Sequence, residues 1–237
     1  MSKEEVEKIK IVLIGDAGVG KSCIISTYFG NEFNENMPPS LGVSSLGKHI
    51  KIGDKKVLLS LWDTAGQEIF HSLIKNFYKD TCVICLVYDI TKKNSFYNLK
   101  SEWYKDIQKN GRKNVILAVV GNKCDLFKSK EVDEEDAREF AEKIGAIFML
   151  TSAKNNASIN ELFEYLAEKY LSPEYESIVN EIKKERASSF NLNDGKNDGC
   201  CKKKNVVKKK FDGVYNIILK DNFNYIFLKI IIIGMII

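Results

Sequence analysis

Histidine is scarce in this 237-residue sequence, and its charges nearly cancel over most of its length. The two histidines, His49 and His71, have no His or Cys near them in the sequence, so they predict polar surface roles rather than metal ligands. Of the 36 Lys and Arg and the 32 Asp and Glu residues, nine and three lie after residue 195, which leaves residues 1–195 with a net charge of −2. A folded part without a net positive charge is not expected to bind nucleic acid.

An apolar leader is also missing, because residues 1–10 are mostly charged. We therefore expect no signal peptide and a cytosolic protein whose thiols stay reduced. Four cysteines lie in or beside apolar runs and are expected to be small core residues: Cys23, Cys82, Cys85 and Cys124. Cys82 and Cys85 have a spacing that occurs in metal sites, but residues three apart on a strand face opposite sides, so we expect no metal there.

A glycine-rich turn with the sequence GDAGVGKS follows the apolar run 9–14 and precedes the amphipathic stretch 23–29. A strand that ends in such a turn directs several backbone N–H groups, and the positive end of the next helix, at one point. This context favours a polyphosphate-binding loop over an ordinary turn between a strand and a helix. We expect Lys21 to reach the outer phosphates and Ser22 to bind Mg²⁺. The expected nucleotide-binding residues here are Gly15, Asp16, Ala17, Gly18, Val19, Gly20, Lys21, Ser22 and Cys23.

A second motif, WDTAGQE, starts at Trp62 directly after the strand-like run 56–61. An Asp at a strand end is well placed to hold the water shell of Mg²⁺, which predicts that role for Asp63. The glycine at position 66 allows its backbone N–H to approach a γ-phosphate, so this loop is expected to sense whether that phosphate is present.

The third and fourth motifs, GNKCD and TSAK, also follow apolar runs, 115–120 and 146–150. The Asp125 carboxylate can accept two hydrogen bonds from guanine that adenine cannot offer, and an unpaired buried acceptor costs about 1–3 kcal/mol. The Ala153 backbone N–H is expected to meet the guanine O6. The predicted base-binding residues are Asn122, Lys123, Asp125, Ser152, Ala153 and Lys154. Because each motif lies at the carboxyl end of a predicted strand, all four are expected at one edge of an open α/β sheet.

Segments with the spacing of a helix lie between the predicted strands. Phe96, Leu99 and Trp103 recur every three or four residues within 95–109, where Ser95 is a candidate cap. Further helices are predicted at 133–144 and 159–170. This alternation of strands and helices indicates parallel βαβ units.

With these motifs in place, the chain resembles the Rab family of small GTPases, within the Ras superfamily, over about residues 9–171. The Rab-like sequences are residues 62–68, 72–74, 77–78, 87–91 and 95–96, and residues 71–73 and 139–154 look closest to endosomal Rabs. The resemblance implies an α/β P-loop NTPase fold in a small G domain over residues 1–172. Its six-stranded, mostly parallel sheet would be flanked by five helices. It also implies a GTP/GDP switch that uses Mg²⁺ and hydrolyses GTP.

Further site residues follow from the resemblance. Phe33 would cover the guanine ring, with a buried loop anchor as the alternative. Ser40 would bind Mg²⁺ together with Ser22 and Asp63, while Gly66 would contact the γ-phosphate and Gln67 would orient the attacking water.

Two departures from the Rab pattern fall in the first switch, residues 33–45. Ser40 stands where the family has Thr, so the hydroxyl is kept but the methyl that restricts χ1 is lost, and we expect a competent but looser GTP state. Ser45 stands where Rabs usually carry a Phe beside Trp62 and Phe77, which puts effector choice in doubt.

The resemblance also implies partners: a GEF, a GAP, GDI or an escort protein, and effectors. Neither switch contains an arginine, so hydrolysis without a GAP should be slow. We expect a monomer on the cytoplasmic face of endomembranes, endosomes among them, that cycles with the cytosol. The alternative is a nucleotide-bound scaffold with negligible hydrolysis. An ATP-using P-loop kinase is disfavoured because the Asn122, Lys123 and Asp125 pattern selects guanine.

The tail divides into two predicted parts. Residues 173–210 are expected to be a flexible basic tail whose Cys200 and Cys201 resemble the paired cysteines that carry geranylgeranyl groups in Rabs, but 36 residues follow them. The apolar run 225–237 is 13 residues long and contains Lys229, and as a helix of about 20 Å it is too short for a bilayer core of about 30 Å. In residues 211–237, 19 of the 27 are Phe, Tyr, Asn, Lys or Ile, so this extension is a candidate for translated noncoding sequence.

Overall fold

The computed structural model describes residues 6–38, 40, 42–64, 77–78, 80–112, 114–177 and 180. The predictions for Gly66, Gln67 and His71, and those for the tail beyond residue 180, lie outside the described residues. So do residues 65–76 and 79, and the expected count of five helices is therefore not tested.

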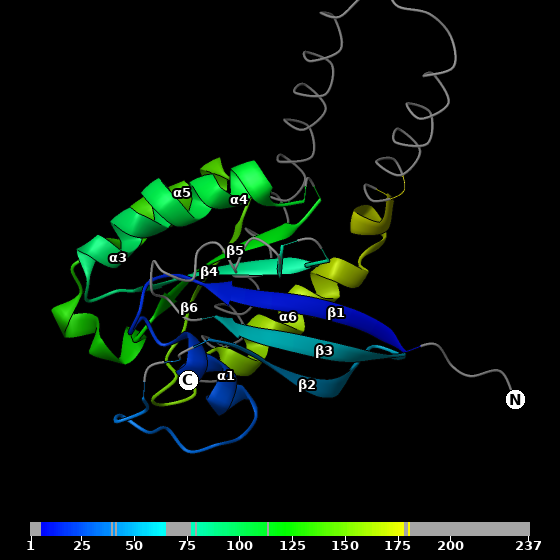
Figure 1. Cartoon of the computed structure of the whole chain (residues 1–237), viewed down its shortest axis with the longest axis horizontal. Coiled ribbons are helices and arrows are strands. Elements are labelled where there is room, and N and C mark those ends of the chain that lie inside the picture. The colour runs from blue at the N-terminus through cyan, green and yellow to red at the C-terminus, as the bar shows by residue number, and fades with distance from the viewer. Residues whose placement is uncertain are drawn as a thin grey trace, which may run out of the picture.

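A six-stranded sheet forms the centre of the molecule (Figure 1). Its strands are β1 (Glu7–Ile14), β2 (Val43–Ile52), β3 (Lys55–Thr64), β4 (Val83–Asp89), β5 (Ile116–Asn122) and β6 (Ile147–Leu150). They lie in the order β2-β3-β1-β4-β5-β6, and every neighbouring pair is parallel except β2 and β3. The predicted six-stranded, mostly parallel sheet is confirmed.

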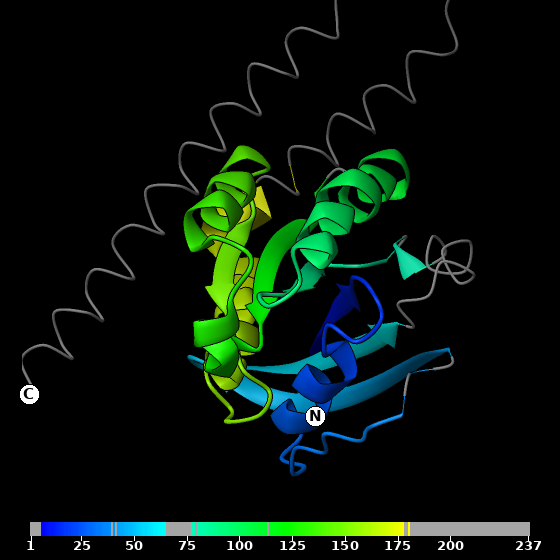
Figure 2. The same ribbon diagram turned by 90° about the vertical axis from the view of Figure 1, so that its left-hand side faces the viewer.

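Helices cover both faces of this sheet (Figure 2). They are α1 (Lys21–Tyr28), α3 (Lys93–Asn98), α4 (Tyr104–Asn110), α5 (Glu134–Lys143) and α6 (Ile159–Leu171). A π-helical turn, η2 (Leu99–Trp103), joins α3 and α4 into one continuous helix, and a 3₁₀ segment, η3 (Cys124–Ser129), follows β5.

Two apolar clusters explain this layering, because successive side chains of a strand point to opposite faces. In β1, Ile11 and Leu13 pack with α1 and α6, while Val12 and Ile14 pack with α3, α4 and α5. These β1 side chains are fully buried, as expected for a parallel sheet covered on both sides. β1 lies between β3 and β4, so the strand order reverses at β1. In open α/β sheets, ligands bind at the carboxyl ends of the strands at such a switch point.

The predicted helix start at Ser95 is wrong. The helix begins at Lys93, and Ser95 is buried inside its first turn, where its hydroxyl accepts a hydrogen bond from the Asp89 N–H and donates to the Lys92 carbonyl. The helix ends at Asn110, one residue beyond the predicted end. At α5, the helix begins at Glu134 rather than at Asp133, and Asp133 is the N-cap, whose side chain accepts a hydrogen bond from the Glu135 N–H.

The expectation that Cys82 and Cys85 face opposite sides is also wrong. β4 begins at Val83, so Cys82 lies before the strand and packs into the same apolar cluster as Cys85. Both thiols are buried, whereas Cys23 and Cys124 are only half-buried. Within the described ranges no group of three His, Cys, Asp or Glu side chains could hold a metal ion. His49 is exposed, as predicted.

Over the part of the chain that the structure describes, no helix is both long enough and apolar enough to cross a membrane.

Candidate nucleotide-binding site

The glycine-rich turn leaves β1 at Ile14 and leads directly into α1, as its sequence predicted. Two of its glycines are required by their surroundings. A Cβ on Gly15 would lie 2.1 Å from the Val87 carbonyl oxygen, and one on Gly20 would lie 2.2 Å from the Asn122 side-chain nitrogen. Gly20 also has a φ of 98°, in the region that favours glycine. The backbone therefore passes close to both β4 and β5 at this point.

Lys21 lies at the start of α1 and is almost fully buried. Its ammonium group donates hydrogen bonds of 2.8 Å to the carbonyl oxygens of Gly15 and Asp16. Burial lowers the pKa of Lys21 to about 8, although the Asp63 and Asp16 carboxylates act in the opposite direction. A buried cation beside glycine-rich backbone fits the phosphates of a nucleotide.

The three predicted metal-binding residues lie together. The Ser22 and Ser40 hydroxyls are 2.7 Å apart, and each donates to the same oxygen of Asp63, at 2.7 and 2.9 Å. The other oxygen of Asp63, Oδ1, is buried without a hydrogen-bond partner. Hydroxyl and carboxylate oxygens are ligands that Mg²⁺ prefers, and a buried unpaired oxygen needs a partner, so this set of residues fits that ion.

The base-binding motifs lie side by side after β5 and β6. Asp125 is exposed, and its carboxylate accepts a hydrogen bond of 2.5 Å from the buried Ser152 hydroxyl. This bond orients the carboxylate that the sequence assigns to guanine, a role for Ser152 that the sequence did not specify. Ala153 is buried beside it, and Lys154 is exposed at the rim.

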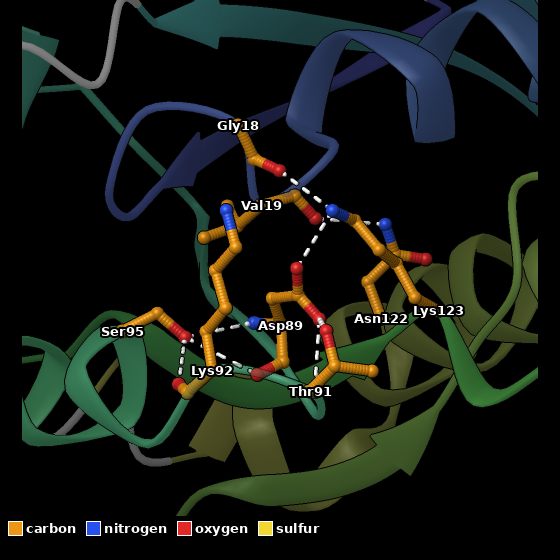
Figure 3. A network of polar contacts seen from close by, with 8 residues as sticks. All are labelled: Gly18, Val19, Asp89, Thr91, Lys92, Ser95, Asn122 and Lys123. Carbon is orange, nitrogen blue, oxygen red and sulfur yellow. Dashed lines mark hydrogen bonds and ion pairs between the residues drawn. The ribbon is translucent and has the colours of Figure 1, made fainter. Parts of the chain in front are cut away.

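Asn122 and Lys123 connect the base-binding motif to the glycine-rich turn (Figure 3). Asn122 donates to the Val19 carbonyl at 2.9 Å, and Lys123 donates to the Gly18 carbonyl at 2.9 Å. The Lys123 ammonium also forms an ion pair of 2.6 Å with Asp89, as the central side chains of Figure 3 show.

Asp89 is a fully buried carboxylate to which sequence reasoning assigned no role. Its second oxygen accepts hydrogen bonds from the Thr91 N–H and hydroxyl, at 2.9 and 2.7 Å. Burial alone would raise the pKa of Asp89, but the contacts with Lys123 and Thr91 outweigh it and hold the pKa below its ordinary value. Asp89 could have been identified from its position at the carboxyl end of an apolar strand, which is equivalent to the position of Asp63 on β3.

These motifs surround a cavity of about 320 Å³, which falls in the range for small-molecule sites. Phe33 lines it and remains 37% exposed, so the alternative of a buried loop anchor is wrong. The cavity is also lined by residues that sequence reasoning did not select: Asn34, Glu35, Met37, Pro38, Thr64 and Leu126.

Ser45, the second departure from the Rab pattern, lies on the edge strand of the sheet. Ser45 on β2 is exposed and pairs directly with Trp62 on β3. The Trp62 and Phe77 rings are 5.1 Å apart, as the expected aromatic pair requires, and the Lys10 ammonium lies 4.7 Å from the centre of the Trp62 ring.

Comparison with known proteins identifies the family and relatives of this chain. The family model described as the Ras family matches residues 10–172. The Ras-related protein Rab-31 of Homo sapiens is 45% identical over 159 residues, which cover 67% of this chain and 81% of that protein. Rab-22A of Canis lupus familiaris is 42% identical over 158 residues, covering 67% and 81%. Rab-21 of Geodia cydonium is 39% identical over 169 residues, covering 71% and 73%.

Fold, motifs and relatives thus define a guanine-nucleotide-binding protein with a G domain. The chain belongs to the Ras family and, within it, is a Rab small GTPase that acts in membrane trafficking.

Proposed function

We propose that this Rab GTPase binds GTP and GDP in the cavity described above, holds Mg²⁺ through Ser22, Ser40 and Asp63, and uses Gln67 in hydrolysis. The contacts of 2.7–2.9 Å that join the two hydroxyls to one carboxylate oxygen carry this proposal. These residues come from α1, the first switch and β3, which are far apart in the sequence. Among the described residues no contact favours the alternative of a scaffold without hydrolysis, since Ser40 keeps its place beside Asp63.

Each part of the site has a separate task in this proposal. Lys21 and the backbone of residues 15–20 bind the phosphates, and Asp125, oriented by Ser152, reads the base. Mg²⁺, when bound, neutralises charge on the β- and γ-phosphate oxygens. Gln67, which lies outside the described residues, would orient the attacking water, and catalysis then rests on positioning rather than on a covalent intermediate.

We also propose that the protein cycles between the cytosol and the cytoplasmic face of endomembranes. GDI or an escort protein would act through geranylgeranyl groups on Cys200 and Cys201, since two lipid chains with a basic tail support stable attachment. The similarity to Rab-31, Rab-22A and Rab-21 supports endosomes as the compartment. A GEF and a GAP would set the nucleotide state, and effectors would bind in the GTP state.

Single-turnover GTP hydrolysis tests the catalytic part of the proposal. With Mg²⁺ and without a GAP, Gln67→Leu should slow phosphate release by about tenfold or more, because leucine cannot hydrogen-bond a water, while GTP affinity stays within about threefold. Gln108→Leu, the same change at an exposed position of α4, is the matched control and should behave as wild type. Equal rates for Gln67→Leu and wild type would contradict the assignment. No phosphate release from wild type would favour the scaffold.

A further inference from the structure

The carboxylate of Asp16, the second residue of the phosphate-binding turn, contacts the continuous helix that α3, η2 and α4 form. Its Oδ2 accepts a hydrogen bond of 2.8 Å from the Asn98 amide, and its Oδ1 accepts one of 2.8 Å from the Trp103 indole N–H. Asn98 ends α3 and Trp103 ends η2, more than 80 residues along the chain from Asp16. Both oxygens are therefore bound by one helix.

The π-helical turn explains how two residues five apart can reach one carboxylate. In a regular α-helix Asn98 and Trp103 would point about 140° apart around the axis. Residues 99–103 instead form a π-helix, whose i→i+5 hydrogen bonds bring such a pair toward the same side. Single π-turns are uncommon and occur frequently at functional sites. Trp103 is only 2% exposed, so its indole N–H needs an acceptor, which Asp16 supplies.

The main chain of Asp16 connects this contact to the phosphate site. Its carbonyl oxygen, together with that of Gly15, accepts the hydrogen bonds of the Lys21 ammonium. On the other side, the Gly15 backbone lies so close to the Val87 carbonyl that no Cβ could fit between them. The segment that receives Lys21 is thus fixed by β4 on one side and by the Asp16 carboxylate on the other.

We propose that Asp16 is a positioning residue for the nucleotide: its bonds to Asn98 and Trp103 hold the carbonyl groups that orient Lys21 toward the phosphates of the guanine nucleotide. This inference rests on the proposed function, because it requires those phosphates to bind at Lys21. It gives the continuous helix α3-η2-α4 an influence on nucleotide release that acts through Asp16 and Lys21.

Dissociation of a fluorescent GDP from the full-length protein tests the proposal. Asp16→Ala should release GDP about tenfold faster than wild type, the size expected for loss of a charge-assisted contact. Asp16→Asn should stay within about threefold, because its amide oxygen can accept from Trp103 while the Asn98 amide rotates to accept from the new NH₂. Asn98→Ala should release GDP about threefold faster or more. Asn110→Ala is the matched control, because it removes a 2.6 Å amide–carboxylate bond, to Asp106, at the far end of the same helix.

A second readout follows the contact itself. The sequence has two tryptophans, so a Trp62→Phe substitution in every sample leaves only the fluorescence of Trp103. Asp16→Ala should change the emission maximum of Trp103, whereas Asp16→Asn should not. GDP release from Asp16→Ala at the wild-type rate, or from Asp16→Asn at the rate of Asp16→Ala, would overturn the inference alone. If Asp16→Ala does not fold, equal GDP release from Asn98→Ala and Asn110→Ala would overturn it. A wild-type protein that retains no GDP would overturn the proposed function as well.

Discussion

Replacing Asp89 with Asn removes one charge from its partly exposed ion pair with Lys123 while nearly preserving the shape of the side chain. Asp89 has no exposed side-chain surface, and the Lys123 side chain is 31% exposed. The asparagine can still accept hydrogen bonds from Thr91. Lys123 keeps its bond to the Gly18 carbonyl but loses the carboxylate that lies 2.6 Å from its ammonium group.

The exposure of Lys123 limits the size of the effect. Breaking a fully buried pair costs about 3–5 kcal/mol, and an exposed pair contributes about 0.2–1 kcal/mol. Because water can reach Lys123 but not Asp89, we expect Asp89→Asn to lower the free energy of unfolding by about 2 kcal/mol. For a domain of this size, that is a fall in melting temperature of about 4–8 °C.

Urea unfolding at saturating Mg²⁺ and GDP measures this difference, with GDP held at the same multiple of its Kd for each variant. Thr91→Val, which removes only a hydroxyl donor to Asp89, should cost less, about 1 kcal/mol. The folded pKa of Asp89 is below its ordinary 3.8, so its contribution is present above the unfolded pKa and is lost as the pH falls through the folded pKa. The difference in the free energy of unfolding between wild type and Asp89→Asn should therefore be constant from about pH 8 to 5 and should become smaller below about pH 4. A gap below about 0.5 kcal/mol, or one that does not narrow in acid, would refute the ion-pair reasoning.

Two further predictions concern Ser22 and Ser40, the proposed Mg²⁺ ligands. Ser22→Asn should weaken GTP more than GDP, because the γ-phosphate shares the metal ion while the β-phosphate keeps its other contacts; equal losses in a direct titration of both nucleotides would contradict this. Ser40→Thr restores the residue typical of the family and should slow GTP dissociation by a few tenths to about 1 kcal/mol, since a β-branched side chain loses less rotamer freedom on ordering. Release of GDP should hardly change, and unchanged release of both labelled nucleotides at saturating Mg²⁺ would show that residue 40 does not touch the metal.

The strand ends and their motifs could be predicted from the sequence because apolar runs and short glycine-containing motifs are local signals. Parallel strands place their carboxyl ends at one sheet edge, so the sequence alone predicts that Ser22, Asp63 and Asp125 belong to one site. The contact between Ser22 and Asp63 agrees with that assignment. The helix at 93–110 was found from its apolar spacing, but its start was misplaced by two residues, because a serine inside a first turn resembles a cap in sequence.

The missed features depend on contacts between distant residues. The sequence assigned no role to Asp89, because its partner Lys123 lies directly after β5 and is brought to it only by the pairing of β4 with β5. Trp103 fits the apolar stripe of its helix, and only the π-helical turn shows that its N–H is directed at Asp16. Helical periodicity assumes a constant number of residues per turn, so it cannot detect such a local change.

Titration of wild type and Asp125→Asn with GDP and ADP is the most direct test of guanine recognition at this site. The carboxylate should accept two hydrogen bonds from guanine, so Asp125→Asn should weaken GDP by about tenfold or more while gaining no affinity for ADP. Asp133→Asn, the same substitution at the exposed cap of α5, is the matched control and should bind GDP as wild type does. The account predicts tight GDP and weak ADP binding by wild type, with the loss confined to Asp125→Asn. Unchanged GDP affinity in Asp125→Asn, or equal affinity of wild type for the two nucleotides, would contradict it.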